Sequence, residues 1–404
     1  MRKSLKLCIF TVLVCSFLLG TGMAVQAESK PSGVAINDTN FSSYLKWHAK
    51  NADTNKDGYL SGKEASKVKE LYFTARKAVE SFKGIEYFPD VEKFVYRAGI
   101  VDEDEAVYEE STASVVDLSG FKKLKSVYIH SGTDYLRTVN LQDCTNLRDV
   151  QIEGMRDGCV DTLNLDGCTN LRTIKLSSLF ITKLNLSGFK HLTEVDIGDD
   201  FKEKLQTLNL KKCSNLKTVS VWSDRLIKLK LKGAKKLESL NVTAASLTNL
   251  DLTSNTQLKD LHLGSGTKVA SLDLSHNTEL MTMGCYQTEL TALDFSHNKN
   301  LVKVDCHNNK NIASINVKGC KKLRTLRFDN TKVRRIDVKT NTNLRNLRCE
   351  NTALERLNLK KNVNLQKLRC ENTRLTKLNL SNTKIRKPSA LKCDPDVTVT
   401  YASK

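Results

Sequence analysis

Two consecutive 21-residue segments near the end of the chain repeat each other so closely that they restrict the kind of fold available. Residues 341–361 are NTNLRNLRCENTALERLNLKK and residues 362–382 are NVNLQKLRCENTRLTKLNLSN, with 13 of 21 positions identical. Apolar and polar residues alternate over only a few positions in each segment, which predicts short strands with one buried side. One such unit has too little apolar surface for a core of its own, so the units must stack into a solenoid.

The same spacing continues back through most of the chain. One turn position of the repeat recurs every 21 to 24 residues, at Phe121, Cys144, Cys168, Phe189, Cys213, Ala234, Asn255, Asn277, Asn298, Cys320, Asn341, Asn362 and Thr383. A period of 20 to 29 residues with the pattern L-x-x-L-x-L-x-x-N/C is that of a leucine-rich repeat. Because so short a repeat has no room for a full helix, we predict a β-rich solenoid of about 14 repeats over residues 82–387. Residues 388–404, with alternating Val397 and Val399, are predicted to form a capping strand.

The first 27 residues have the character of a secretory signal peptide. Arg2, Lys3 and Lys6 precede an apolar run from Leu7 to Gly20, and Ala27 ends the segment. A lipid anchor at Cys15 is the alternative, but Val14 stands where that signal has a small residue. No later run reaches 18 apolar residues, so we predict an exported protein without a membrane span.

After a linker at residues 28–37, residues 38–81 are predicted to form a small helical cap of EF-hand type. Apolar residues have helical spacing over 41–52, and a second helix is expected over about 64–76. Between them, residues 53–64 match D-x-[DN]-x-[DN]-G-x5-E. The predicted Ca²⁺ ligands are Asp53, Asn55, Asp57, the Tyr59 carbonyl, Ser61 through water, and both oxygens of Glu64. A single loop before a solenoid favours a structural role for one calcium ion; the alternative is a cap that keeps the turn and binds no metal.

Ten cysteines lie beyond the signal peptide, and most fall in two columns of the repeat. Cys285, Cys306, Cys349 and Cys370 take an apolar strand position that Phe328 also fills, whereas Cys144, Cys168, Cys213 and Cys320 take the turn position that elsewhere holds Asn. Residues that exchange with Phe or Asn are interpreted as packing groups or hydrogen-bond donors. We therefore predict buried free thiols in both columns. Cys159 and Cys393 lie off both columns, and their disulfide status stays open.

Positive charge is concentrated at the C-terminal end. The chain has a formal charge of +19, and residues 318–404 hold 23 Lys and Arg against 7 Asp and Glu. Such an end suits anionic polymers, for example wall teichoic acid or acidic glycans, although a solvated and solubilising face explains it as well. Nucleic acid is the least favoured partner, because no nucleic-acid-binding module is recognised and the chain is predicted to be exported.

Two sets of basic residues recur one turn apart and are candidate binding faces. The first set is Arg327, Arg348 and Arg369, each with Asp329, Glu350 or Glu371 two positions later on the same side of its strand. The second set is Arg335, Arg356 and Lys377, beside Asp337, Asn358 and Asn379, and is less compensated. The structural interpretation of the first set is a ladder of cross-strand ion pairs worth about 0.2–1 kcal/mol each.

The motifs L-x-x-L-x-C at residues 344–349 and 365–370 and L-D-L-S-x-N-T at 272–278 resemble those of secreted bacterial leucine-rich-repeat proteins, in particular the internalin-like branch with a cysteine ladder. An EF-hand-like cap before the repeats is also similar to that family's architecture. The resemblance implies recognition of a protein or glycan on a host or bacterial surface along the exposed strand face. The chain lacks the wall-anchoring motif and immunoglobulin-like spacer of many relatives, which puts an invasion role in doubt.

No constellation of catalytic residues is recognised. H-E-x-x-H, G-x-S-x-G and a phosphate-binding loop are missing from the sequence, and His276 and His297, which share a column, are interpreted as bystanders. We predict a secreted, non-enzymatic binding or adhesion protein with a calcium-stabilised cap. The alternative is a wall-associated structural protein held by its basic C-terminal repeats to anionic wall polymer. An enzyme in the irregular loops between residues 132 and 203 is a weaker third hypothesis.

Overall fold

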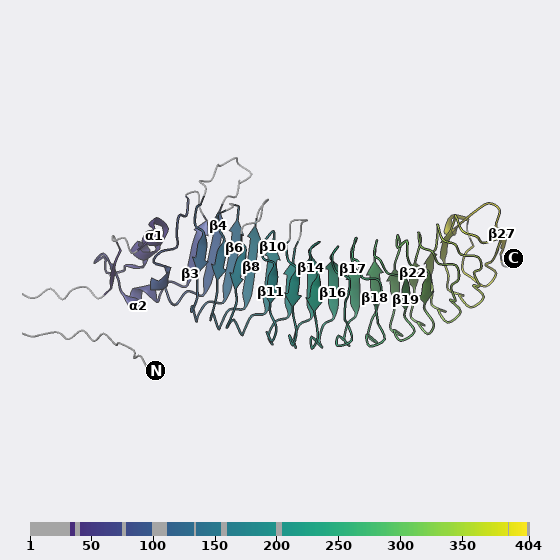
Figure 1. Ribbon diagram of the computed structural model, residues 1–404, viewed down its shortest axis with the longest axis horizontal. Helices are drawn as coiled ribbons and strands as arrows, with labels where there is room; N and C mark the ends of the chain where they lie inside the picture. Colours follow the sequence, from purple (N-terminus) through teal and green to yellow (C-terminus); the bar gives the residue numbers. More distant parts are fainter. Residues whose placement is uncertain are drawn as a thin grey trace, which may run out of the picture.

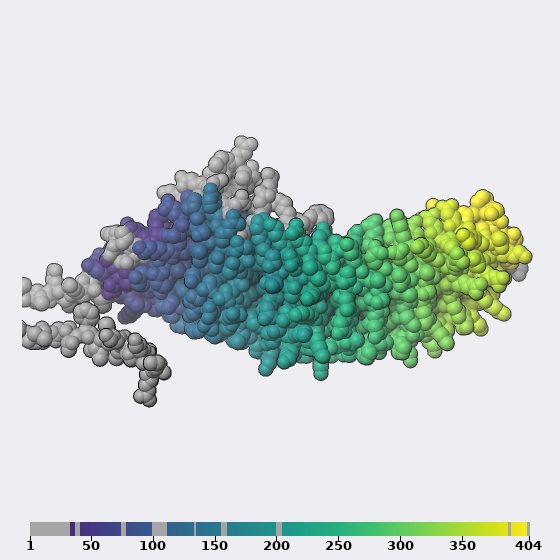
Figure 2. All heavy atoms as spheres, viewed as in Figure 1, coloured from purple at the N-terminus to yellow at the C-terminus, as the bar shows by residue number. Residues whose placement is uncertain are grey.

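The protein is an elongated, gently curved solenoid with a small helical segment at one end (Figure 1). The computed structural model describes residues 33–36, 41–74, 78–98, 111–132, 135–154, 160–198, 204–386 and 388–401. Successive repeats follow one another as bands along the rod (Figure 2). The predicted signal peptide at residues 1–27 and Cys159 lie outside the described residues. No helix within the described ranges has the length and apolar character needed to cross a bilayer.

One parallel sheet of 15 strands runs along the whole solenoid, with each repeat adding one strand beside the last. We call its outward side the main-sheet face. The strands are β3 (Glu70–Thr74), β4 (Lys93–Ala98), β6 (Ser126–Ser131), β8 (Asp149–Gly154), β10 (Thr173–Ser177), β12 (Glu194–Ile197), β14 (Thr218–Trp222), β16 (Ser239–Thr243), β17 (Asp260–Leu263), β18 (Thr282–Cys285), β20 (Lys303–Asp305), β22 (Thr325–Arg327), β23 (Asn346–Arg348), β24 (Lys367–Cys370) and β26 (Leu391–Cys393).

A second side of each turn carries short L-x-L segments, some of which pair into small parallel sheets. These are β5 (Val115–Asp117), β7 (Thr138–Asn140) and β9 (Thr162–Asn164); β11 (Lys183–Asn185), β13 (Thr207–Asn209) and β15 (Lys228–Lys230); β19 (Ala292–Asp294) and β21 (Ser314–Asn316); and β25 (Lys377–Asn379) and β27 (Thr398–Thr400). We call this the small-sheet face. The predicted β-rich leucine-rich-repeat solenoid is thus confirmed.

The core lies between the two faces and consists of columns of leucine and similar side chains. In the repeat that contains β23, Leu344, Leu347, Cys349 and Leu354 are completely buried. The strand residues between them, Asn346 and Arg348, remain partly exposed. This is the alternation expected of strands with one buried side.

The turn column of Asn and Cys forms hydrogen bonds between repeats. The Asn341 Nδ2 group donates to the carbonyl oxygens of Val317 and Cys320, both at 2.9 Å, and the side chain is completely buried. The Cys320 thiol donates to the Phe295 carbonyl at 3.3 Å, and Cys144, Cys168 and Cys213 donate likewise at 3.0 Å. The interpretation of this column as small buried donors is confirmed. Cys supplies one hydrogen bond where Asn supplies two.

The N-terminal cap is only partly helical, and the predicted extent of the second helix, residues 64–76, is wrong. Helix α1 covers Ser43–Ala52, but α2 covers only Gly62–Ala65, and a 3-10 turn, η1, covers Ile85–Tyr87. Strand β3 occupies Glu70–Thr74 and pairs with β4 in the main sheet. Leu71 and Phe73 are completely buried. Burial of every second residue is the pattern of a strand, so this segment is a strand and not a helix. The repeat sheet therefore begins at Glu70 rather than at residue 82.

The C-terminal segment extends both faces of the solenoid. After a 3-10 turn, η2 (Pro388–Ala390), strand β26 pairs with β24 and strand β27 pairs with β25. The segment predicted to form a capping strand, residues 388–404, thus contains two short strands, of which β27 covers Thr398–Thr400. In β26, Cys393 lies directly beside Cys370. Cys393 is therefore a member of the strand ladder, and its assignment off both columns is wrong.

The nine cysteines in the described ranges are free, and all except Cys393 are buried. Burial raises the pKa of the Cys370 thiol to about 12, and burial is also the main cause that holds the pKa of Cys349 well above its usual range. For Cys306 the hydrogen bond with Cys285 is the main cause of a raised pKa, followed by burial. Because the thiolate is the reactive form, Cys306, Cys349 and Cys370 are protected both by their low accessibility and by their raised pKa.

We expect Cys285, Cys306, Cys349 and Cys370 to stay unlabelled by a thiol reagent in the native protein and to react only after denaturation. Cys393 serves as the internal control, because it is half-buried and should react first. Peptide mass spectrometry after a timed labelling reaction measures each site separately. Rapid native labelling of the four buried thiols would contradict their place in the core.

Candidate binding face and calcium loop

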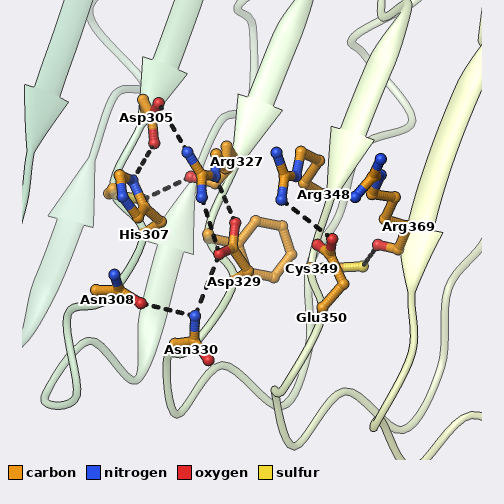
Figure 3. Close-up of polar contacts among 12 residues, drawn as sticks. Asp305, His307, Asn308, Arg327, Asp329, Asn330, Arg348, Cys349, Glu350 and Arg369 are labelled. Atoms are coloured by element: carbon orange, nitrogen blue, oxygen red, sulfur yellow. Dashed lines mark hydrogen bonds and ion pairs between the residues drawn. The ribbon is translucent and has the colours of Figure 1, made fainter.

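Parallel pairing arranges the outward side chains of the main sheet in columns. One column runs through Asn241, His262, Gly284, Asp305, Arg327, Arg348 and Arg369. Two residues further along the chain, in the adjoining column, come Tyr286, His307, Asp329, Glu350 and Glu371. The first predicted set of arginines thus belongs to one continuous strip of the main-sheet face, whose ion pairs are drawn in Figure 3.

The arginine column is held by ion pairs at one end and is free at the other. Arg327 Nε lies 2.7 Å from Asp329 Oδ1, and Arg327 Nη1 lies 3.7 Å from Asp305 Oδ2. The hydrogen bond to Asp329 raises the pKa of Arg327. Arg348 Nη2 lies 3.3 Å from Glu350 Oε1 (Figure 3). Arg369 is exposed, and its guanidinium has no ion pair to any described residue. These pairs form mainly within one repeat, between the last strand residue and the acid two positions later, and not across strands as expected.

The second predicted set lies on the small-sheet face. Arg335 and Arg356 are joined by an isolated parallel bridge, and Lys377 begins β25. All three are exposed, and within the described ranges none has an ion pair. Asp337 does not pair with Arg335, because its carboxylate lies 3.0 Å from Lys339 Nζ. The two candidate sets therefore belong to different faces.

A hollow of about 400 Å³ opens on the main-sheet face beside the arginine strip. Its lining includes His262, Thr282, Tyr286, Lys303, Asp305 and His307. The hollow exists because Gly264 and Gly284 interrupt the two outward columns. A Cβ atom at Gly284 would overlap the His262 imidazole, and one at Gly264 would overlap the Thr243 side chain. The sequence analysis missed this hollow, although glycine at two outward positions, one in β18 and one just after β17, could have indicated it.

The walls of the hollow are fixed by contacts among themselves. The Tyr286 and His307 rings have centroids 5.0 Å apart, and His307 Nδ1 lies 2.7 Å from Asp305 Oδ1. Asp305 also faces Arg327, so the hollow joins the arginine strip through one shared carboxylate. Tyr286 keeps 38% of its surface exposed. An exposed aromatic ring, an imidazole and paired charges around a concave opening are the groups of a recognition site.

A row of asparagines borders this face and was also missed. Asn308, Asn330, Asn351 and Asn372 all have φ between 54° and 57°, the left-handed region that Asn tolerates better than most residues. Asn330 Nδ2 donates to Asn308 Oδ1 at 2.6 Å (Figure 3), and the next two steps are 2.8 Å each. The row ends where Asp394 accepts the backbone N–H of Asn372. These bonds fix the edge of the face from one repeat to the next.

The predicted calcium loop is a closed turn held by its own carboxylates. Asp53 Oδ2 accepts from the Gly58 backbone N–H at 3.0 Å, and Asp57 Oδ1 accepts from that of Tyr59 at 2.8 Å. Asn55 Oδ1 accepts the Asp57 backbone N–H at 3.1 Å. Residues Tyr59 and Leu60 form β2, which pairs antiparallel with β1 (Val34–Ala35).

Glu64 closes the loop. Its Oε2 accepts from the Ser61 hydroxyl at 2.7 Å and from the Ser61 N–H at 3.0 Å, and its Oε1 accepts from the Thr54 N–H at 2.9 Å. Ser61 accepts in turn from the Glu64 N–H, which completes a capping box at the start of α2. The hydrogen bonds from Ser61 are the main cause that lowers the pKa of Glu64 to about 2.

The donors of this loop suit a hard cation. They are oxygen atoms throughout, and Asp53 Oδ1 is buried without a hydrogen-bond partner in the described part of the chain. Both oxygens of Glu64 are engaged by Ser61 and Thr54, so they would have to exchange these bonds for a metal. Within the described ranges, no three Asp, Glu, His or Cys side chains converge as a metal site. A bound ion would thus depend on Asn55, Ser61 and the Tyr59 carbonyl as well.

Comparison with known proteins supports the fold. No family model matches the chain, and no curated protein matches it. Among solved structures, the functional domain of InlJ from Listeria monocytogenes, which includes a cysteine ladder, is similar over 88% of this chain and 79% of its own, with 20% identity and a TM-score of 0.50. The internalin InlF of the same organism is similar over 92% of this chain and 98% of its own, with 17% identity and a TM-score of 0.50.

The structure of the Toll–Spätzle complex of Drosophila contains a chain that is similar over 87% of this chain and 49% of its own, with 16% identity and a TM-score of 0.52. At these identities the likeness shows the fold alone. The chain is a leucine-rich-repeat solenoid similar to internalins.

Proposed function

We propose that this chain is a non-enzymatic binding or adhesion protein that recognises a protein or glycan on a host or bacterial surface. The observation that carries the proposal is the hollow around Gly284, where an exposed Tyr286 adjoins an ion-paired arginine strip. Tyr and Arg are the residues most enriched among binding hot spots. A solenoid of this fold holds a protein partner in the Toll–Spätzle complex.

The geometry of the face explains how it would bind. The hollow admits one side chain or sugar ring of the partner against the Tyr286 ring. Arg327 and Arg348 are already oriented by Asp329 and Glu350, so binding would order few additional side chains. The rigid asparagine border and the parallel sheet keep these groups at fixed separations. The main-sheet face would therefore act as a preorganised surface.

The proposal includes export and a calcium-stabilised cap. Export rests on the signal-peptide character of residues 1–27. The ion would be held by Asp53, Asn55, Asp57, Tyr59, Ser61 and Glu64, supported by the oxygen donors and the unpartnered Asp53 Oδ1. Calcium there would neutralise the three carboxylates and fix the loop between α1 and α2. It would have no part in ligand chemistry.

We expect Tyr286→Ala to weaken capture of the partner by roughly 30-fold, because it removes the exposed wall of the hollow. The bait is the chain without residues 1–27, tested against host-surface and bacterial-wall extracts at low and high salt. A captured protein or glycan is then titrated against each variant. Shape-complementary binding should survive about 0.5 M salt, whereas retention by charge alone should not.

Tyr135→Ala is the matched control, because Tyr135 is an exposed aromatic residue outside the main sheet. It should leave the affinity within about twofold of the parent protein, as expected for an uninvolved surface residue. Equal losses in the two variants, or no loss in Tyr286→Ala, would place the recognition site elsewhere.

A further inference from the structure

We propose that a trough on the small-sheet face, at the C-terminal end of the solenoid, binds the phosphate groups of a linear polyol-phosphate polymer. The trough has a volume of about 630 Å³ and is lined by three successive turns of the chain. It is separate from the hollow around Gly284, with which it shares no lining residue. A surface-recognition protein with this trough would have a second binding function.

The trough is lined by positive charges and polar groups over a leucine floor. Leu357 and Leu378 are buried, whereas Lys360 and Lys377 are exposed. The polar lining is completed by Asn358, Asn379, Ser381, Asn382, Thr398 and Thr400. Among the described residues, the lining of the trough includes no carboxylate. An anion on this surface would meet positive charges and many hydrogen-bond donors.

At two asparagines of the trough, the hydrogen bonds already formed leave donors rather than acceptors available. Asn358 Oδ1 accepts the Lys360 backbone N–H at 3.1 Å, and Asn379 Oδ1 accepts that of Ser381 at 3.0 Å. At Asn358 and Asn379 the amide oxygen is thus engaged and the amide N–H groups can still donate, whereas Asn382 Nδ2 already donates to the Lys360 carbonyl at 3.1 Å. A phosphate diester offers only acceptors and a negative charge, so it matches this set better than a neutral sugar or a cation does.

The trough differs from the preceding turn in its charge balance. At the position equivalent to Lys360 one turn earlier, Lys339 is paired with Asp337 at 3.0 Å. Asn358 and Asn379 then replace the acid, and Lys360 and Lys377 have no ion pair within the described ranges. At this lysine position, the acid that pairs with Lys339 is therefore replaced by Asn in the turns that line the trough.

A linear polymer fits because the same groups recur at every turn. Arg335 and Arg356 extend the row of Lys377 along the small-sheet face, with strands about 4.8 Å apart. On the other face of the same repeats, Arg327 and Arg348 are neutralised by acids. The net positive charge of residues 318–404 is thus more available on the small-sheet face, where a chain of phosphates would contact several turns at once.

The test is a titration of the chain without residues 1–27 with poly(glycerol phosphate) at low salt. We expect the double variant Lys360→Gln, Lys377→Gln to bind about tenfold more weakly than the parent, from the loss of two exposed charge contacts. The matched control is Lys228→Gln, Lys232→Gln. Lys228 begins β15 as Lys377 begins β25, and Lys232 follows it by four residues, as Lys360 follows Arg356.

The control removes the same charge from exposed positions outside the trough and should lose less than about twofold in affinity. Equal losses in both double variants would overturn the proposal, as would undetectable binding by the parent protein. Stronger binding to anionic lipid vesicles than to the polymer, with the same dependence on Lys360 and Lys377, would overturn the choice of ligand. Because no partner of the main-sheet face is present in the titration, its result is independent of the proposed recognition function.

Discussion

Replacing Asn341 by Asp is expected to lower the free energy of unfolding by more than about 3 kcal/mol at pH 7. The Asn341 side chain is completely buried and donates two hydrogen bonds, to the carbonyl oxygens of Val317 and Cys320. An ionised carboxylate has no proton to donate and would place a charge against these two oxygen atoms. The midpoint of urea unfolding, followed by circular dichroism, measures the loss.

The pH dependence of this variant has a definite sign. Burial and the carbonyl oxygens would raise the folded-state pKa of the new carboxyl above its unfolded value of about 3.9. The penalty is therefore greatest above the folded-state pKa and shrinks as the pH falls toward 3.9. There the protonated carboxyl donates one hydrogen bond, as a Cys thiol does in the same column. The difference from the parent protein should be smaller at pH 4 than at pH 7.

Two control variants distinguish the effect of burying a charge from the effect of losing a hydrogen bond. Asn341→Cys should cost only about 1 kcal/mol, because Cys320 occupies the same position one turn earlier and donates a single hydrogen bond. Asn343→Asp makes the same change at an exposed residue, whose Nδ2 donates to the Lys321 carbonyl, and should also cost about 1 kcal/mol or less. If Asn341→Asp cost no more than Asn343→Asp, the buried column would not stabilise the stack as proposed.

The period of the repeat made the fold predictable. Leucines at fixed intervals require stacking whatever the intervening residues are, and the exchange of Cys with Asn or Phe showed that those positions are buried. The spacing also placed the arginine and acid columns side by side, because i and i+2 lie on one side of a strand, although the ion pairs of Arg327 and Arg348 form mainly within a repeat and not across strands. Features that depend only on the residue pattern within one repeat, such as the buried columns, could therefore be predicted.

The Gly284 hollow could not be predicted in the same way, because it depends on which residues of several strands become neighbours. Its shape comes from Gly284 beside His262 and Asp305 in the paired strands. Cys393 was misplaced for a related reason. It follows Cys370 by 23 residues rather than 21, and the extra residues are accommodated around the 3-10 turn at Pro388–Ala390.

The segment after the calcium loop was mispredicted because tertiary packing overrides its helical character. The Phe73 ring lies 4.9 Å from that of Phe82 and 5.4 Å from that of Phe94, measured between centroids. A strand at Glu70–Thr74 points Leu71 and Phe73 inward together and also covers the edge of β4. The cap is thus joined to the first repeats through an aromatic cluster.

Calcium is expected to stabilise the cap by about 2.7 kcal/mol when its concentration is a hundredfold above Kd. An isolated extracellular loop binds at about 10⁻⁴ to 10⁻³ M, so the full gain should require about 10 to 100 mM calcium, and a smaller gain is expected at about 1 mM. The ion would give Asp53 Oδ1 a partner and reduce the repulsion among Asp53, Asp57 and Glu64. Melting temperature measured with calcium and with chelator tests this expectation.

The Asp57→Ala variant distinguishes the stabilisation due to the metal from that due to the hydrogen bonds of the loop. In chelator, the variant should lose only the bonds that Asp57 makes to Tyr59 and Asn55, worth about 1 kcal/mol each. In calcium, it should lose in addition most of the stabilisation that the ion provides to the parent protein. The informative quantity is the difference between these two losses.

The aromatic cluster predicts where chelation acts. Phe41 of the cap packs against Tyr87 and Phe88, with ring centroids 5.2 Å and 6.2 Å apart, and Tyr44 packs against Phe73. If calcium leaves the loop, α1 should detach more often from these rings, so hydrogen exchange should accelerate over residues 85–94 before the C-terminal repeats. Because end caps protect a solenoid from fraying, the effect should decline along the rod. Unchanged protection of this segment, or an identical calcium response of Asp57→Ala and the parent, would contradict the metal role and leave a metal-free cap held by its own hydrogen bonds and aromatic contacts.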